Sequence, residues 1–95
     1  MHTATMPERR HPQPVSAPEP CGPITRPAAS RPIWVDVQTD QGTVERTKGF
    51  AVAWTPKLVR VQVLWPKEYY SAATEFWVSA SRVAARTIEP QWLGR

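Results

Sequence analysis

The sequence predicts a small all-β domain preceded by a proline-rich arm. Eight of the eleven prolines lie in residues 1–32, whereas all the tryptophans, tyrosines and phenylalanines lie in residues 33–95. After residue 32, apolar and polar side chains alternate in several short runs, which is typical of half-buried strands. Five such runs are too short to stack as two large sheets, but they can curl into a small barrel that hides its own edges.

The arm, residues 1–32, is expected to be disordered and in part polyproline II. A segment without aromatic residues cannot bury enough apolar surface to offset the entropy lost on ordering. Proline also lacks the N–H group that helices and strands use. The expected division is therefore a disordered arm at 1–32, a barrel at 33–90 and a short C-terminal tail at 91–95. Deletion of the arm is expected to leave folding intact.

The first two strands are predicted on either side of a turn at residues 40–42. In residues 33–38 apolar and polar side chains alternate, and Gly42 is free to adopt the positive φ of a tight turn. A longer run follows at residues 44–55. Its alternation changes at Gly49, so we expect a bulge or a sharp bend there.

The third strand, residues 59–65, shows the clearest alternation in the chain. Val59, Val61 and Val63 share one face, and Arg60 and Gln62 share the other. Val61 is therefore expected at the centre of the core. The remaining chain divides into a polar loop at 67–74, a short strand at 75–78, a tight turn at 79–82 and a last strand at 83–88.

Two segments resemble the SH3-like small β-barrel superfamily. Residues 76–83 are similar to its ending of a short strand, a one-turn 3₁₀ element and a final strand. Residues 49–54 are similar to the glycine-led centre of its long strand. The resemblance covers residues 33–88 and implies an SH3-like barrel with five strands. Because many unrelated proteins share this architecture, it implies a fold rather than a function.

Within that architecture, the chain also resembles the plasmid-borne type II dihydrofolate reductases. The likeness lies in the length, the N-terminal arm, the spacing of residues 49–54 and the strand–turn–strand ending. In those enzymes a Val-Gln-Ile-Tyr segment builds the cofactor and substrate site. The matching residues 74–77 here read Thr-Glu-Phe-Trp, so the glutamine and the tyrosine are missing. No catalytic residue is carried over from the resemblance.

The side chains available for catalysis or metal binding are few. Both histidines, His2 and His11, lie in the arm, and so does the single cysteine, Cys21. A barrel without histidine excludes nucleophilic catalysis by Ser–His or Cys–His pairs, as well as most zinc sites. We therefore expect no enzyme activity, no metal and no cofactor.

The distribution of apolar residues along the sequence predicts where in the cell the protein is found. No run of 18 apolar residues exists, and residues 1–20 contain no apolar core of a secretory signal. The sequence therefore predicts a cytoplasmic protein that does not bind membranes.

Basic and aromatic side chains supply the candidate binding site. The chain carries a net charge of +4, with a pI of about 9.8. Cations beside aromatic rings offer phosphate contacts and stacking surfaces to single-stranded nucleic acid. An ordinary solubilising surface and a structural core are the competing interpretations of these residues. The candidates are Arg46, Lys48, Lys57, Arg60, Arg82, Arg86 and Trp77.

Three functions remain open at the level of sequence. The first is a non-catalytic accessory module that binds DNA or RNA non-specifically and in a salt-sensitive way. The second is an adaptor that binds another protein through the barrel and the proline-rich arm. A small-barrel enzyme resembling type II dihydrofolate reductase is a remote third. The oligomeric state, the partner and the roles of the arm and Cys21 are left open.

Overall fold

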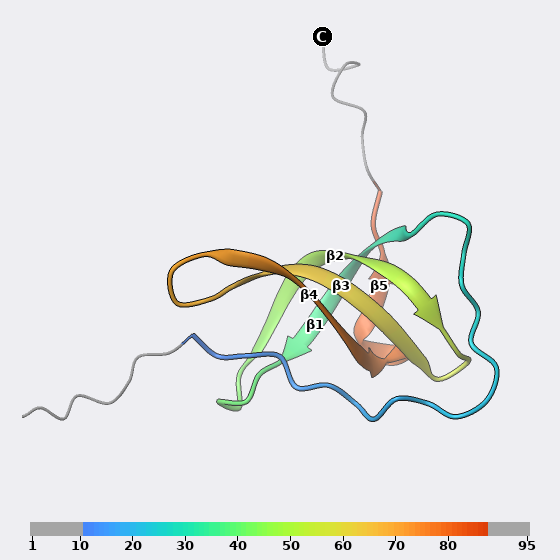
Figure 1. The fold of residues 1–95 in the computed structure, drawn as a ribbon, viewed down its shortest axis with the longest axis horizontal. Coiled ribbons are helices and arrows are strands. Elements are labelled where there is room, and N and C mark those ends of the chain that lie inside the picture. The colour runs from blue at the N-terminus through green and yellow to red at the C-terminus, as the bar shows by residue number, and fades with distance from the viewer. Residues whose placement is uncertain (1–10, 88–95) are drawn as a thin grey trace, which may run out of the picture.

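The fold is a single curled antiparallel sheet, seen in a computed structural model that describes residues 11–87. Its five strands lie in the order β4-β3-β2-β1-β5 (Figure 1), which confirms the all-β prediction. The strands are β1 (Arg31–Gln38), β2 (Val44–Trp54), β3 (Leu58–Pro66), β4 (Ser71–Ser79) and β5 (Val83–Ala85), with the 3₁₀ turn η1 (Ala80–Arg82) before β5. The edge strands β4 and β5 do not pair with each other. None of the helical structure in residues 11–87 is long and apolar enough to cross a membrane.

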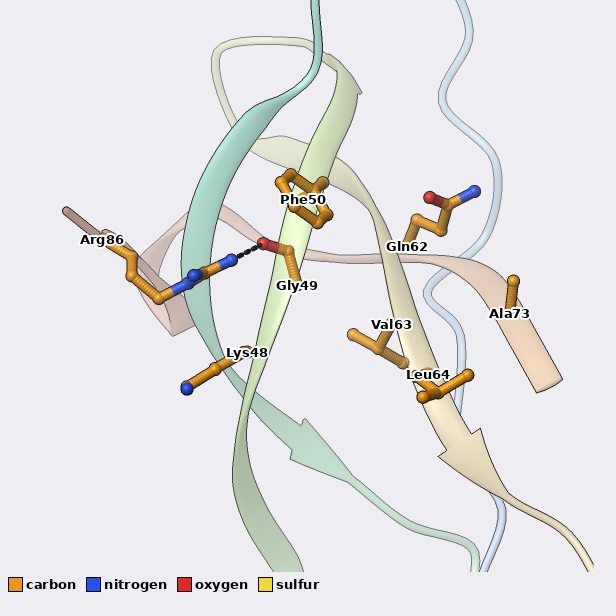
Figure 2. Close-up of a pocket in the computed structure, with 8 residues that line it drawn as sticks. All are labelled: Lys48, Gly49, Phe50, Gln62, Val63, Leu64, Ala73 and Arg86. Atoms are coloured by element: carbon orange, nitrogen blue, oxygen red, sulfur yellow. Dashed lines mark hydrogen bonds between the residues drawn. The ribbon is translucent and has the colours of Figure 1, made fainter. Parts of the chain in front are cut away.

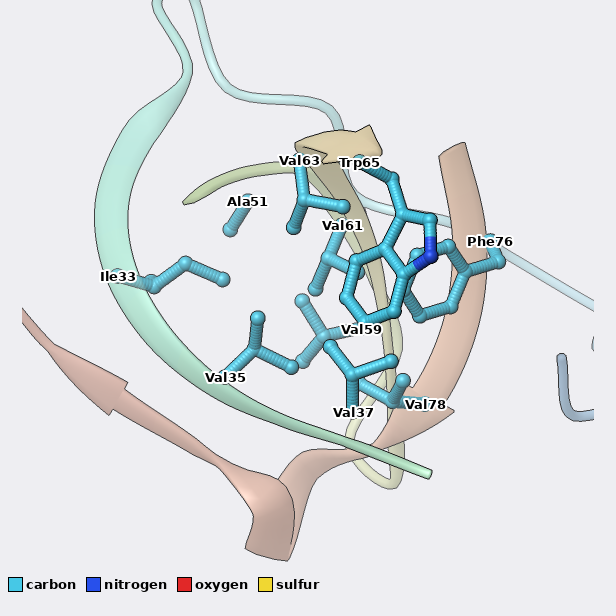
Figure 3. Packing of buried hydrophobic residues seen from close by; sticks show 10 residues of the cluster. All are labelled: Ile33, Val35, Val37, Ala51, Val59, Val61, Val63, Trp65, Phe76 and Val78. Carbon is cyan, nitrogen blue, oxygen red and sulfur yellow. The ribbon is translucent and has the colours of Figure 1, made fainter. Parts of the chain in front are cut away.

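The core lies inside the curl of the sheet, as Figure 3 shows. Period-two alternation places Ile33, Val35 and Val37 of β1 on this inner side. Val61 is 0% exposed, as the sequence predicts. Trp65 and Phe76 fill the end of the cluster beside β4. The core therefore depends mainly on valines from β1 and β3, with two large aromatic side chains closing it.

The irregularity in β2 lies at Val52, not at Gly49 as expected. The pairing of β2 with β3 shifts between Ala51 and Ala53, which identifies the bulge. Gly49 serves the close approach of two strands instead. A Cβ atom on Gly49 would lie 2.7 Å from the carbonyl oxygen of Gln62, closer than real side chains come. Burial therefore alternates through Gly49, Ala51 and Ala53, while the pairing with β3 shifts by one residue at Val52.

The last two strands differ in length from the prediction. β4 spans Ser71–Ser79 and takes in the second half of the expected loop at 67–74. β3 supplies a hydrogen-bonding partner along this whole stretch, so small polar side chains do not prevent strand formation. β5 contains only Val83–Ala85 of the expected 83–88. Residue 88 and the predicted tail at 91–95 lie outside the described residues.

The arm differs from the expected disorder over residues 11–30, which lie along the sheet (Figure 1). The amide of Val15 donates to the carbonyl of Gln38 over 2.8 Å, and the amide of Ala17 donates to the carbonyl of Trp77 over 2.8 Å. Thr25 exchanges a pair of backbone hydrogen bonds with Trp54. Non-proline residues between the prolines keep their N–H groups, and the extended backbone suits pairing with a strand edge. Residues 1–10 lie outside the described residues, and residues 31–32 belong to β1.

Side chains of the sheet also hold the arm. The indole Nε1 of Trp65 donates to the carbonyl of Pro12 over 2.7 Å, and Lys67 Nζ donates to Gln13 Oε1 over 2.8 Å. The amide of Trp77 donates to Ser16 Oγ over 3.1 Å. Residues 12–17, called the closing segment below, therefore connect the end of β1 to β4.

We predict that the arm stabilises the domain. Five backbone hydrogen bonds join it to the sheet, and each contributes about 0.5–1.5 kcal/mol. Removal of residues 1–27 should therefore lower the free energy of unfolding in urea by about 3 kcal/mol or more. Equal urea midpoints for the two proteins would restore the expectation that the arm is dispensable.

A matched pair of proline substitutions isolates the backbone bonds from the rest of the arm. Val15→Pro removes the N–H that donates to Gln38, and it should cost about 1 kcal/mol. Glu19→Pro, at an exposed position of the same arm, should leave the urea midpoint unchanged.

Val61 is predicted to be among the costliest positions in the chain. Val61→Asp places an unpaired carboxylate where the side chain is 0% exposed, costing several kcal/mol, comparable to the whole stability of a small domain. Leu64→Asp on the same strand is the control, because Leu64 is 69% exposed. Circular dichroism should show an unfolded Val61→Asp protein and a folded Leu64→Asp protein. A folded Val61→Asp protein would contradict the core described here.

Candidate functional site

The outer face of β1 and β2 carries a cluster of aromatic and basic side chains. The register places Trp34 opposite Lys48, Asp36 opposite Arg46 and Pro32 opposite Phe50. Neighbouring residues on an antiparallel pair that face each other point to the same side of the sheet. Since the odd-numbered residues of β1 fill the core, these even-numbered residues face away from it.

Trp34 lies between two cations. The guanidinium carbon of Arg46 is 5.6 Å from the centroid of the Trp34 ring, and Lys48 Nζ is 5.9 Å from it. Arg46 also lies 3.4 Å from a carboxylate oxygen of Asp36, a long contact between exposed groups. Each such cation–π contact at an exposed site is worth about 0.5–1 kcal/mol. The ring is partly exposed, so it keeps surface on which a planar group can stack.

Arg86 brings a third cation to the same face. Its guanidinium carbon lies 5.4 Å from the centroid of the Phe50 ring. Its Nε donates to the carbonyl of Ile33 over 3.0 Å. Its Nη2 donates to the carbonyl of Gly49, also over 3.0 Å (Figure 2). Arg86 is therefore fixed in place across β1 and β2. We call Trp34, Arg46, Lys48, Phe50 and Arg86 together the cation–aromatic face.

A pocket of about 390 Å³ continues this face across β3 towards β4 (Figure 2). Apolar groups form most of its surface, including the partly exposed ring of Phe50 and the 69% exposed side chain of Leu64. Lys48 and Arg86 supply its positive charge, and no acidic side chain lines it. Its lining residues are Lys48, Gly49, Phe50, Gln62, Val63, Leu64, Ala73 and Arg86.

The structure brings together three of the seven predicted site residues, Arg46, Lys48 and Arg86. The others lie elsewhere or are already paired. Arg60 forms a 2.8 Å ion pair with Glu75, which also accepts a hydrogen bond from Gln62. Arg82 lies in η1 and donates to Gln38 Oε1 over 3.2 Å. Lys57 lies in the turn between β2 and β3.

Trp77, predicted from the sequence as a nucleic-acid-binding residue, is only 3% exposed and offers no surface for stacking. The core covers one face of β4 at Phe76 and Val78, while the arm crosses the strand at Trp77. Three successive residues of β4 are therefore buried, which alternation alone does not predict. The indole Nε1 of Trp77 has no hydrogen-bond partner within residues 11–87, and Arg60 lies 5.9 Å from its ring centroid.

Sequence reasoning missed two residues of the face. Neither Trp34 nor Phe50 is among the seven candidates named from the sequence. Phe50 shares its parity with Arg46 and Lys48, and that signal would have placed it on the outer face. The expected bend at Gly49 concealed it, because a bend there would have turned Phe50 inward.

The described residues contain no group of three or more histidine, cysteine or acidic side chains that could hold a metal ion. The cation–aromatic face places positive charges beside partly exposed rings, which is chemistry suited to a planar, negatively charged group. Comparison of the chain with protein-family models, with curated proteins and with solved structures finds no match.

We predict that Arg86 stabilises the fold in addition to carrying a positive charge on the cation–aromatic face. Arg86→Met keeps an apolar stem over Phe50 but removes the hydrogen bonds to the carbonyls of Ile33 and Gly49. Thermal unfolding should show a loss of about 1–3 kcal/mol. The control is Arg46→Met, which likewise removes a cation–π contact but otherwise only an exposed ion pair, and it should cost about 1 kcal/mol or less. Equal losses for the two variants would contradict the structural role of Arg86.

Proposed function

We propose that the protein is a non-catalytic module that binds single-stranded DNA or RNA on the cation–aromatic face. The observation that carries this proposal is Trp34, partly exposed and flanked by Arg46 and Lys48 within 6 Å of its ring. Proteins that bind single strands without sequence preference combine aromatic rings, on which bases stack, with cations that contact the phosphates. The adjoining pocket adds a second ring, Phe50, and a third cation, Arg86.

The chemistry of the face indicates how such binding would behave. Stacking of one base on an aromatic ring is worth about 1–3 kcal/mol and tolerates any base. Three cations contacting phosphates of a single strand give a slope of about −2 for log K against log salt. Binding should therefore be non-specific in sequence, modest in affinity and sensitive to salt. A duplex hides the faces of its bases, so a single strand is the favoured ligand.

An SH3-like barrel is the architecture we propose for this module. The strand order and the 3₁₀ turn between β4 and β5 support it, and so does the closing segment, which connects the end of β1 to β4. In this arrangement the cation–aromatic face lies on the outside of the barrel wall.

We predict that reversing one charge on the face weakens binding more than reversing a charge elsewhere. Lys48→Glu should lower the affinity for a fluorescent oligothymidylate at least about tenfold and flatten the salt slope, because Lys48 lies beside Trp34. Lys57→Glu changes the net charge equally but lies in the turn between β2 and β3. It should have a much smaller effect. Fluorescence anisotropy at two salt concentrations measures both.

Trp34→Ala separates stacking from charge. It should lower the affinity about 5- to 150-fold, which corresponds to about 1–3 kcal/mol of stacking, while leaving the salt slope unchanged. Arg60 is another candidate from the sequence, but Arg60→Glu is a poor variant because it also breaks the ion pair with Glu75. If the unmodified protein binds neither DNA nor RNA single strands at low salt, the proposal fails.

A specific observation favours one second candidate, a protein-interaction adaptor. The sheet already holds the proline-rich arm through backbone hydrogen bonds and the indole of Trp65. Backbone pairing of this kind is how extended peptides add to a sheet edge. Failure of nucleic-acid binding in the experiment above would make this candidate the leading one.

A further inference from the structure

The closing segment is held mostly through its backbone. Its amides at Val15 and Ala17 donate to carbonyls of β1 and β4, and the amide of Asp40 donates to the carbonyl of Gln13. The carbonyl of Pro12 accepts the indole N–H of Trp65. Such contacts depend on the extended shape of the segment and not on which copy of the chain supplies it. The same residues from a second molecule would form every one of these bonds.

The connection between the closing segment and β1 is long and weakly held. Residues 18–30 form no strand, and Thr25 is their only point of backbone pairing with the sheet among the described residues. Thirteen residues reach up to about 45 Å when extended. The connection is therefore long enough to reach the sheet of a neighbouring molecule.

Exposed apolar side chains lie next to the closing segment. The hairpin of β3 and β4 exposes Leu64 by 69%, Tyr69 by 88% and Tyr70 by 66%. The same hairpin carries Trp65 and Lys67, which bind the start of the closing segment. Such a cluster of exposed large side chains on one hairpin marks an interaction surface.

We propose that two copies of the chain exchange their closing segments reciprocally and cover each other's β3–β4 hairpins. Reciprocal exchange repeats every contact of the closing segment twice about a two-fold axis, so none of that segment's hydrogen bonds is lost. The hairpin lies beside the site where the partner's segment enters, and a second copy there removes its apolar side chains from water. This surface shares Leu64 with the pocket beside the cation–aromatic face, whereas Tyr69 and Tyr70 do not line that pocket. The proposal does not depend on nucleic-acid binding.

Protein concentration decides between the closed monomer and the exchanged dimer. A flexible connection holds the segment near its own sheet at an effective concentration of the order of 1 mM. Exchange alone would therefore need millimolar protein. Burial of the hairpin side chains favours the dimer further, and we expect dimers at about 100 µM.

Isotope-filtered NMR tests the exchange without altering the contacts. Cys21→Ser is used throughout, so that oxidation of the exposed thiol of Cys21 cannot link the molecules. Labelled and unlabelled chains are mixed in equal amounts, unfolded together in urea and refolded. Intermolecular NOEs between Pro14 and Thr39, which form an antiparallel bridge, are the expected result. NOEs between these residues only within one chain, at about 1 mM protein, would overturn the proposal.

Sedimentation equilibrium tests the hairpin. In the same background, Leu64→Ser or Tyr70→Ser should raise the dimer dissociation constant at least about tenfold, because each removes a large apolar contact. Val44→Ser is the matched control, since Val44 is 59% exposed but lies on β2 outside this hairpin. A dimer equally affected by all three variants, or a monomer at every concentration, would overturn the proposed interface.

Discussion

Backbone pairing along β1 is the constraint on which the rest of the molecule depends. β1 pairs with β2 along its whole length and with β5 over three residues, and its end pairs with the arm. Its inner side chains, Val35 and Val37, are 0% exposed and lie in the middle of the core. Its outer side chains include Trp34, the centre of the cation–aromatic face. A shift of one residue in this register would exchange the two faces and remove both core and site.

Burial on both sides of β4 follows from the curl of the sheet and the course of the arm. Phe76 and Val78 point into the core, whereas Trp77 points to the other side and would be exposed in an isolated sheet. The arm crosses at that position and bonds to both backbone groups of Trp77. The arm contains no aromatic residue of its own, and it is ordered in part because it covers Trp77 of β4.

The cations of the outer face differ in what they are free to do. The charge of Arg60 is balanced by the ion pair with Glu75. Arg86 donates two hydrogen bonds to backbone carbonyls, and its positive charge has no acidic partner within residues 11–87. Lys48 lies beside Trp34 without an acidic partner among the described residues. A modest net charge therefore says little about binding by itself. What matters is which cations lie beside an exposed ring.

Composition and period-two alternation determined the fold class, the inner faces of β1 and β3 and the central place of Val61. These features are local, because alternation within one strand is enough to define its two faces. Only the tertiary structure decided the length of β4, the bulge at Val52 and the order of residues 11–30, because each depends on a partner strand distant in sequence. It also decided which cations gather. Arg46, Lys48 and Arg86 meet because β2 and the end of β5 lie on opposite sides of β1, and no pattern within a single strand contains that pairing.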